Sequence, residues 1–413
     1  MSLNETPRSV RVHIALFGKR NAGKSSIINA ITGQDIAIVS SVKGTTTDPV
    51  YKSIEILPIG PCVIIDTAGL DDSGQLGELR KKKTMEVLNK TDISLAVIDS
   101  TVGVTEYDRY IIDEVKGRNI PLIGVLNKAD ISHIDEKDIK SIKKELDIPL
   151  VAVSAVTGKG IKELKNHIAG VLPKEEDKFK IIGDLISPGD FVVLVTPIDK
   201  AAPKGRLILP QQQTIRDILE SDAIAIVTKE YELRETLESL GKKPKIVVTD
   251  SQVFLKVAAD TPKDILMTSF SILFARFKGD LVELIKGVKA VKKLKNGDRV
   301  LVAEGCTHHR QSDDIGKVKI PRWIRQITGK KIEFEFSSGV SFTDDIKRYS
   351  LIVHCGGCML NKSAMLHRIN TAKEFGVPIV NYGMLIAYVQ GILDRALAPF
   401  PRAKMIWNEV EEH

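Results

Sequence analysis

Near the N-terminus, glycine, lysine and serine are spaced as in a loop that binds phosphate. The segment Gly18-Lys-Arg-Asn-Ala-Gly-Lys-Ser25 follows the apolar run HIALF and precedes a helical pattern. The backbone N–H groups of such a loop, together with the N-terminus of the next helix, surround phosphate oxygens. Lys24 would reach the β- and γ-phosphates of a nucleotide, and Ser25 would bind a magnesium ion. The residues expected around the phosphates are Gly18, Asn21, Ala22, Gly23, Lys24, Ser25 and Ser26.

A second motif, Asp66-Thr-Ala-Gly69, follows the apolar run CVIID. Asp66 would hold the magnesium ion through a water molecule, and the backbone N–H of Gly69 would bind the γ-phosphate. We therefore expect this motif to act together with Lys24 and Ser25 in hydrolysis.

Two further motifs indicate that the base is guanine. Asn127-Lys128-Ala-Asp130 follows the run PLIGVLN, and Ser154-Ala155 ends the run LVAVSA. The carboxylate of Asp130 can accept hydrogen bonds from N1 and N2 of guanine, which are donors that adenine lacks. A backbone N–H of Ser154 or Ala155 can bind the guanine carbonyl. Together the motifs predict a site for GTP and Mg²⁺.

Over residues 10–172 the chain resembles the translation-factor class of P-loop GTPases. Its segment Gly44-Thr-Thr-Thr-Asp48 is similar to switch I of the branch that acts in tRNA modification and ribosome assembly. This resemblance implies that Thr46 binds magnesium and senses the γ-phosphate, and that Asn21 holds a potassium ion that stimulates hydrolysis. Leu70 stands where small signalling GTPases have a water-orienting glutamine, so another group or a cation must replace that function. The acidic residues that could do so are Asp71, Asp72 and Glu78.

Three of the four cysteines lie in two short motifs in the last third of the chain. Cys306-Thr-His308 follows the run RVLVAEG, and His354-Cys-Gly-Gly-Cys358 follows the run SLIV. If these runs are neighbouring parallel strands, both motifs lie at the same edge of a sheet. Three thiolates at that edge fit zinc or an iron–sulfur cluster equally well, and reduced buried cysteines are the alternative. Cys62 lies within a strand pattern and is expected to be a buried apolar residue.

With these motifs the whole chain resembles the HydF family of [FeFe]-hydrogenase maturation GTPases, and the segment PIDKAAPKGRLILPQQQTIRDIL is similar to that family too. The resemblance implies a [4Fe-4S] cluster on Cys306, Cys355 and Cys358, and a homodimer formed through the central domain. It also implies a scaffold that receives a transient diiron subcluster from two radical maturation enzymes and passes it to apo-[FeFe]-hydrogenase. Three cysteines leave one iron for an exchangeable ligand. The candidates for that ligand, or for a close neighbour of the cluster, are Glu304, His308, His309 and His354.

Short apolar runs alternate with helical patterns along the chain, which predicts an α/β fold with parallel sheets. A charged segment from Pro173 to Lys178 separates the first set of runs from the second. We expect a P-loop GTPase domain, then a small α/β dimerisation domain, then a C-terminal α/β domain that binds the iron–sulfur cluster. The expected parts are an N-terminal tail at 1–9, the GTPase domain at 10–172, a linker at 173–180, the dimerisation domain at 181–264 and the cluster domain at 265–413.

The composition is that of an ordinary globular protein: of 413 residues, 43% are hydrophobic, 27% charged and 5% aromatic. No apolar stretch could span a membrane, and the first residues lack the apolar core of a signal peptide, so we expect a cytoplasmic protein without membrane contact. The net charge is +7, but no aromatic residues interleave with the basic runs, so nucleic-acid binding is not expected. The alternative functions are an RNA- or ribosome-directed GTPase with a structural zinc domain and a redox switch that uses the same cysteines.

Overall fold

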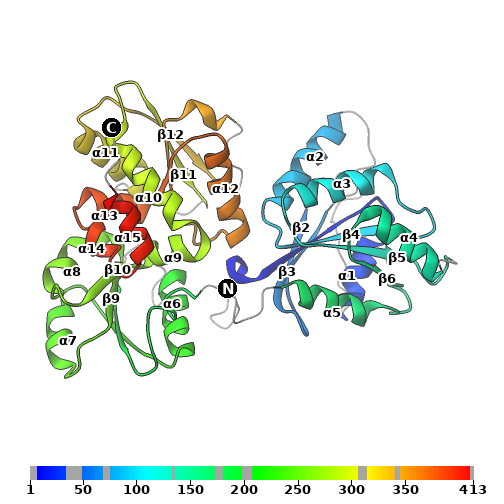
Figure 1. Cartoon of the computed structure of the whole chain (residues 1–413), viewed down its shortest axis with the longest axis horizontal. Coiled ribbons are helices and arrows are strands. Elements are labelled where there is room, and N and C mark those ends of the chain that lie inside the picture. The colour runs from blue at the N-terminus through cyan, green and yellow to red at the C-terminus, as the bar shows by residue number, and fades with distance from the viewer. Residues whose placement is uncertain are drawn as a thin grey trace. The chain divides into compact units, whose positions relative to one another are not determined.

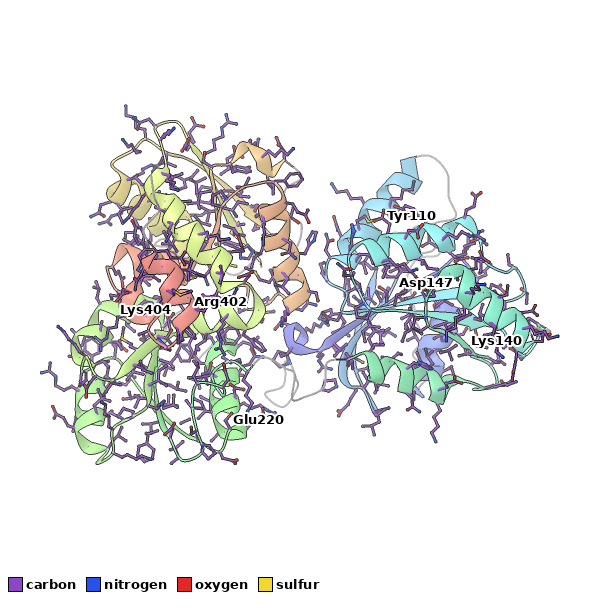
Figure 2. All side chains as sticks on the ribbon, viewed as in Figure 1. Tyr110, Lys140, Asp147, Glu220, Arg402 and Lys404 are labelled. Atoms are coloured by element: carbon purple, nitrogen blue, oxygen red, sulfur yellow. The ribbon has the colours of Figure 1, made fainter. Side chains whose placement is uncertain are left out.

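The computed structural model describes residues 7–33, 49–67, 75–132, 135–172, 180–197, 207–305, 314–339 and 345–409. The chain forms two compact units, Met1–Lys178 and Phe179–His413 (Figure 1). Side chains fill the space between helices and sheets in each unit, and charged residues such as Lys140 and Glu220 lie at the surface (Figure 2). No helix within the described ranges is both long enough and apolar enough to cross a membrane.

The first unit contains a six-stranded sheet with the order β2-β3-β1-β4-β5-β6. Only β2 is antiparallel to its neighbour, and the other strands are parallel. The strands are β1 (Val12–Phe17), β2 (Val50–Ile56), β3 (Gly60–Asp66), β4 (Ile93–Asp99), β5 (Leu122–Asn127) and β6 (Leu150–Ala152). The helices are η1 (Arg8–Val10), α1 (Lys24–Thr32), α2 (Gln75–Leu88), α3 (Glu106–Gly117), α4 (Glu136–Leu146) and α5 (Ile161–Val171).

The central strand β1 illustrates why this sequence forms a covered parallel sheet. Ile14 and Leu16 contact the core on one face, whereas Ala15 and Phe17 contact the core on the other. Successive side chains of a strand point to opposite faces, so a continuous apolar run requires helices on both sides. The helices α1 and α5 cover one face, and α2, α3 and α4 cover the other (Figure 1).

The apolar runs that predict strands in the first unit, HIALF, CVIID, SLAVID, PLIGVLN and LVAVSA, all form strands, and β2 is an additional strand. It pairs with β3 at the edge of the sheet, from Val50 opposite Asp66 to Ile56 opposite Gly60. Most of its residues are only partly buried, and Lys52 and Glu55 interrupt the apolar pattern. An edge strand with one solvated face does not need the continuous apolar run by which the inner strands were predicted.

The second unit contains two four-stranded parallel sheets with the orders β10-β9-β7-β8 and β12-β11-β13-β14. In both sheets the first strand along the chain lies between the second and the third. The strands are β7 (Phe191–Val195), β8 (Ile224–Thr228), β9 (Ile246–Thr249), β10 (Leu266–Ser269), β11 (Arg299–Glu304), β12 (Glu333–Ser338), β13 (Leu351–His354) and β14 (Ile379–Asn381). With this order, loops that follow the first and third strands open at a common crevice.

Helices pack around and between these two sheets (Figure 1). The α-helices are α6 (Leu209–Glu220), α7 (Leu233–Ser239), α8 (Phe254–Asp260), α9 (Phe270–Lys278), α10 (Leu281–Ala290), α11 (Ile320–Thr328), α12 (Lys362–Glu374), α13 (Tyr382–Val389), α14 (Leu393–Ala396) and α15 (Pro401–Asn408). The 3-10 turns are η3 (Ser251–Val253), η4 (Val291–Lys293) and η6 (Ile346–Arg348), and η5 (Ile315–Lys319) is a short π-helix. One continuous hydrophobic core joins both sheets, so the two expected C-terminal domains form a single compact unit.

The middle sheet extends past the boundary expected at residue 265. The apolar segment 265–277 has a helical pattern in the sequence, but Leu266–Ser269 forms β10, which pairs in parallel with β9. The helix α9 starts only after Ser269, whose side chain accepts a hydrogen bond from the N–H of Ile272 at 3.2 Å. This N-terminal cap fixes the helix start, and the apolar residues before it complete the sheet.

Candidate functional site

The expected phosphate-binding loop lies between β1 and α1. Gly18 passes so close to β4 that a Cβ atom would lie 2.3 Å from the carbonyl oxygen of Val97. Asn21 and Gly23 have left-handed backbone angles, with φ of 64° and 89°. A Cβ atom on Gly23 would also lie 2.1 Å from Nδ2 of Asn127. The glycines are therefore required by close contacts within the fold as well as by the turn.

The charged and hydroxyl groups of this loop have the arrangement expected for phosphate and magnesium. Lys24 is buried, and its Nζ donates to the carbonyl oxygens of Gly18 at 2.7 Å and of Lys19 at 2.9 Å. Ser25 Oγ donates to Oδ2 of Asp66 at 2.9 Å. Burial raises the pKa of Asp66 above its usual value, although the hydrogen bond from Ser25 and the charge of Lys24 act against this increase. The ends of β1 and β3 thus bring together the groups that hold a metal ion in P-loop proteins.

Asn127 joins the phosphate loop to the segment expected to contact guanine. Its side chain is buried, and Nδ2 donates to the carbonyl oxygen of Ala22 at 2.9 Å. Its Oδ1 accepts a hydrogen bond from the N–H of Ala155 at 3.2 Å. Ser154 is fully buried, and its Oγ accepts from the N–H of Thr157 at 3.1 Å. Asp130 is exposed at the end of the same motif, where its carboxylate can reach a base.

Asp99 was not predicted from the sequence. This residue ends the neighbouring strand β4 and holds the guanine motif in place. Lys128 has a left-handed φ of 66°, and its Nζ donates to Oδ2 of Asp99 at 2.5 Å. Burial alone would raise the pKa of Asp99, but hydrogen bonds from Lys128 and Thr101 outweigh burial and lower it. The sequence signal that could have identified Asp99 is its position as an acidic residue at the carboxyl end of a parallel strand.

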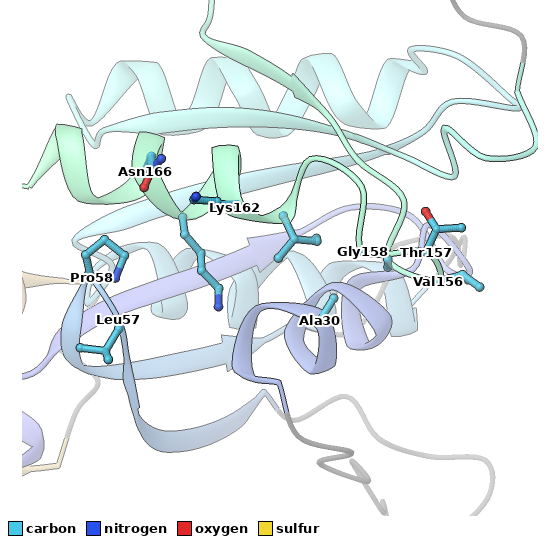
Figure 3. A pocket seen from close by; sticks show the side chains of 11 residues that line it. Ala30, Leu57, Pro58, Val156, Thr157, Gly158, Lys162 and Asn166 are labelled. Carbon is cyan, nitrogen blue, oxygen red and sulfur yellow. The ribbon is translucent and has the colours of Figure 1, made fainter.

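A cavity of about 760 Å³ adjoins the guanine segment (Figure 3). The turn after β2, the end of α1 and the first turns of α5 surround it, with Lys162 and Asn166 on α5. The turn after β2 contributes Leu57 and Pro58, and the segment from Ala155 to Gly158 forms a further wall.

Several predicted residues of the nucleotide site lie outside the described residues. These are Thr46 and its neighbours in the segment 44–48, Gly69, Leu70, Asp71 and Asp72. The side chain of Glu78 is likewise outside the description.

The strands before the two cysteine motifs are parallel neighbours, as predicted. Ala303 of β11 pairs with His354 of β13, so the loops that follow open at the same edge. The N–H of Cys355 donates to the carbonyl oxygen of Ala303 at 2.9 Å, and the N–H of Gly305 donates to Sγ of Cys355 at 3.1 Å. Cys306, His308 and His309 lie outside the described residues, but Gly305, the neighbour of Cys306, contacts the second motif directly.

His354 is held in a way that leaves neither ring nitrogen for a metal ion. Its Nδ1 lies 2.6 Å from the carbonyl oxygen of Cys355, and its Nε2 lies 2.6 Å from Nη1 of Arg368. Because a guanidinium group only donates, Nε2 must accept and Nδ1 must carry the proton. Burial and the charge of Arg368 lower the pKa of His354 to about 3, so the ring is neutral. His354 thus orients Cys355, and its candidacy as an iron ligand is not supported by this geometry.

Glu304 is the other described candidate for the fourth ligand. It is buried at the carboxyl end of β11. A Cβ atom on Gly316 would lie 2.8 Å from Oε1 of Glu304 and 2.4 Å from the hydroxyl oxygen of Tyr382. Burial raises the pKa of Tyr382, and the charges of Glu304 and Cys355 raise it further. Glu304 and Tyr382 therefore both lie next to Gly316.

These residues suit a negatively charged metal cluster. The N–H of Gly305 donates to the sulfur of Cys355, as backbone groups do to thiolates of iron–sulfur clusters. Two buried cations, Lys278 and Arg368, lie next to Cys358 and Cys355. Burial lowers the pKa of Lys278 to about 8, and the charge of Cys358 acts against this change. The described ranges alone bring no three His, Cys, Asp or Glu side chains into a metal-binding group, and Cys306 lies outside them.

Cys62, by contrast, is fully buried in β3, as predicted. Burial raises the pKa of its thiol to about 12, opposed by the charge of Arg11. A neutral thiol inside the core has the packing role of a small apolar side chain.

Three parts of the chain match models of known protein families. Residues 13–128 match the model described as a 50S ribosome-binding GTPase. Residues 181–279 match the hydrogen maturase F dimerization domain, and residues 282–399 match the hydrogen maturase F tetramerization domain. The two latter matches agree with the resemblance predicted from the cysteine motifs.

Curated relatives named as GTPases and a solved G domain are also similar to parts of this chain. The chain is 39% identical over 169 residues to the tRNA modification GTPase MnmE of Thermoanaerobacter sp. (strain X514), covering 40% of this chain and 36% of that protein. It is 30% identical over 234 residues to GTPase Der of Kosmotoga olearia, covering 53% of this chain and 52% of that protein. The chain thus spans about half or less of the length of these relatives. The G domain of the T. maritima FeoB iron transporter is 28% identical, with a TM-score of 0.31, and the match covers 39% of this chain and 98% of that domain.

Proposed function

The chain belongs to the hydrogen maturase F family, and on that basis we propose that it is a GTP hydrolase that carries an iron–sulfur cluster and delivers a diiron unit to apo-[FeFe]-hydrogenase. The observation that carries this proposal is the hydrogen bond from the N–H of Gly305 to Sγ of Cys355 at 3.1 Å. This hydrogen bond connects Gly305, directly before the first cysteine motif, to Cys355, the first cysteine of the second motif. Three thiolates can then converge at one sheet edge.

For GTP hydrolysis, the phosphate loop and the end of β3 act together. The ammonium group of Lys24 stabilises negative charge on the β- and γ-phosphates, and Ser25 and Asp66 hold the magnesium ion. Thr46 and Gly69 are proposed to act at the γ-phosphate, as the sequence predicts. Asp130 is exposed where it can select guanine.

Potassium is proposed as the group that compensates for the missing glutamine. Leu70 cannot orient the attacking water, whereas a monovalent cation beside the phosphates adds positive charge where negative charge develops in the transition state. Asn21 lies at the turn of the phosphate loop, with its side chain exposed. Its amide oxygen is suited to bind such an ion.

In the second unit, Cys306, Cys355 and Cys358 would hold a [4Fe-4S] cluster. When bound, that cluster supplies an iron with an exchangeable coordination position for the diiron unit. Glu304 or His308 is proposed as the weak fourth ligand. His354 fixes the carbonyl group of Cys355 and so orients the loop. Arg368 and Lys278 provide positive charge next to the thiolates.

Self-association is proposed to use the exposed edge of the middle sheet. The strand β8 is at that edge, and the side chains of Ile224 and Val227 are 43% and 46% exposed. An unpaired strand edge with apolar side chains is a site where a second copy can continue the sheet. The apo-hydrogenase and the two radical maturation enzymes are proposed as further partners from the family resemblance. The cytoplasm is proposed as the location, as predicted from the sequence.

Metal analysis tests this function against its alternatives. The protein should be purified without oxygen, and its iron, acid-labile sulfide and zinc should be measured per chain. We expect the parent protein to contain iron and sulfide in equal amounts. Cys355→Ala should lose both, whereas Lys24→Ala should retain both but hydrolyse no GTP. Zinc without iron would favour the RNA- or ribosome-directed GTPase, and the absence of any metal would favour the redox switch.

A further inference from the structure

The last residue of α9, Lys278, reaches into the loop that carries Cys358. Its side chain is buried, with 2% of the residue surface exposed. Its Nζ donates to the carbonyl oxygens of Leu360 at 2.8 Å, Cys358 at 3.1 Å and Gly357 at 3.4 Å. An ammonium group has three N–H donors, so these acceptors use all of them. A single side chain thus determines the path of the loop on both sides of Cys358.

These three acceptors are neutral, so they do not compensate the positive charge of Lys278. Its other contact is with the face of the Phe274 ring, whose centroid lies 5.6 Å from Nζ. Within the described part of the chain, no carboxylate forms an ion pair with Lys278. Burying an ammonium group without an anion is unfavourable. Such a site becomes favourable when an anion binds next to it, and Cys358, whose carbonyl oxygen already accepts a hydrogen bond from Lys278, is a proposed cluster ligand.

The position of Lys278 is fixed by the packing of α9. Two residues before it, Arg276 donates to Oδ2 of Asp184 and to the carbonyl oxygen of Lys180, each at 2.9 Å. Directly after it, Gly279 packs so closely that a Cβ atom would lie 2.9 Å from a side-chain carbon of Ile369 on α12. The helix end therefore cannot shift without disturbing contacts on both sides.

We propose that Lys278 is a positioning residue of the cluster site, which holds the Gly357–Leu360 loop and supplies the positive charge that stabilises the cluster bound through Cys358. This inference rests on the proposed cluster function. Lys278 lies in the part of the chain that matches the dimerization domain model, residues 181–279. The cluster site therefore includes a residue from the middle part of the chain, and that part contributes to more than self-association.

Charge and hydrogen bonding at Lys278 can be separated by substitution. Lys278→Met removes both, Lys278→Gln removes the charge but keeps an amide donor, and Lys278→Arg keeps the charge. The control is Lys286→Met, because Lys286 is exposed on α10 and pairs with Glu283 at 2.8 Å. Each protein is reconstituted with iron and sulfide without oxygen. The measurements are iron and sulfide per chain and the midpoint potential of the cluster by redox titration with electron paramagnetic resonance.

We expect Lys278→Met to hold less iron than the parent, and its remaining cluster to have a more negative midpoint potential, because an added electron loses a nearby positive charge. Lys278→Gln should hold more iron than Lys278→Met but show the same negative shift. Lys278→Arg should keep the potential of the parent. Lys286→Met should match the parent in both measurements.

The inference is overturned if Lys278→Met and Lys286→Met have the same iron content and potential. If Lys278→Met does not fold, judged by circular dichroism, Lys278→Gln decides, and a parent-like potential in that variant contradicts the inference. If neither folds, a negative shift in Lys278→Arg contradicts it and an unchanged potential supports it. A parent protein without iron would instead contradict the proposed cluster function itself.

Discussion

Nη1 of Arg368 lies 2.6 Å from Nε2 of His354 in the interior behind Cys355. Nη2 of the same arginine donates to the carbonyl oxygen of Gly339 at 2.8 Å. The other ring nitrogen of His354 contacts the carbonyl group of Cys355. These contacts connect α12, β13 and the end of β12, so the first cysteine of the motif is oriented from inside the fold.

Removing this arginine should destabilise the second unit. Arg368→Met leaves the acceptors on His354 and Gly339 buried without a donor, and we expect a loss of about 2 to 4 kcal/mol in the free energy of unfolding. Both tryptophans of the chain, Trp323 and Trp407, lie in this unit, so their fluorescence during denaturant unfolding reports on it. Arg402→Met is the control, because Arg402 is exposed. Equal midpoints for the two variants would contradict the structural role of Arg368.

The fourth cluster ligand should be distinguishable from His354 by spectroscopy. We expect Glu304→Ala or His308→Ala to keep a cluster but to change its electron paramagnetic resonance spectrum and its response to added imidazole. The cluster that remains in His354→Ala should respond to imidazole as the parent does, since both nitrogens of His354 are already occupied. An altered response in His354→Ala alone would mean that the histidine binds iron.

Potassium should accelerate GTP hydrolysis more than sodium does, and the difference should depend on Asn21. Because Asn21 has a φ of 64°, Asn21→Gly removes the amide group without straining the backbone. We expect this variant to hydrolyse GTP at similar rates in potassium and sodium, near the sodium rate of the parent. Steady-state phosphate release in the two salts at equal ionic strength measures this. A parent protein with equal rates in both salts would remove Asn21 from the proposed role.

A charge on the exposed edge of β8 should weaken self-association. Val227→Lys places an ammonium group where a second copy would continue the sheet, and charged edge residues oppose strand pairing. Light scattering should give about half the mass of the parent assembly. The control is Leu266→Lys on β10, the opposite edge, where Leu266 is 36% exposed. If only the control changed the mass, the interface would lie at β10.

The nucleotide site could be predicted because its residues are adjacent in the sequence or follow recognisable strands. Gly18 to Ser25 carries its geometry within one loop. Asn127 ends a strand with a continuous apolar run, and Ser154 lies just after another strand. The predicted neighbour relationship of the strands before Cys306 and Cys355 is also confirmed. In each case a local pattern determines where the chemistry lies.

The residues that support the cysteine loop could not be predicted in this way. Lys278 lies 80 residues before Cys358 and directly follows an apolar segment with a helical pattern, and only the folded chain shows that its ammonium group faces the loop. Similarly, the sequence alone is compatible with His354 as a ligand of the cluster or as a neighbour of it. The choice depends on Arg368, whose position relative to His354 is set by the packing of α12 against the sheet.

Transfer of the diiron unit to hydrogenase is the most direct test of the proposed function. The protein should first be loaded with its cluster and the diiron unit in the absence of oxygen. It should then be mixed with apo-[FeFe]-hydrogenase, and hydrogen evolution should be followed over time. Cys355→Ala, treated in the same way, is the comparison. Our account predicts that the parent produces active hydrogenase and that Cys355→Ala produces none. Equal hydrogen evolution with both proteins, or none with a parent that contains its full iron and sulfide, would contradict it.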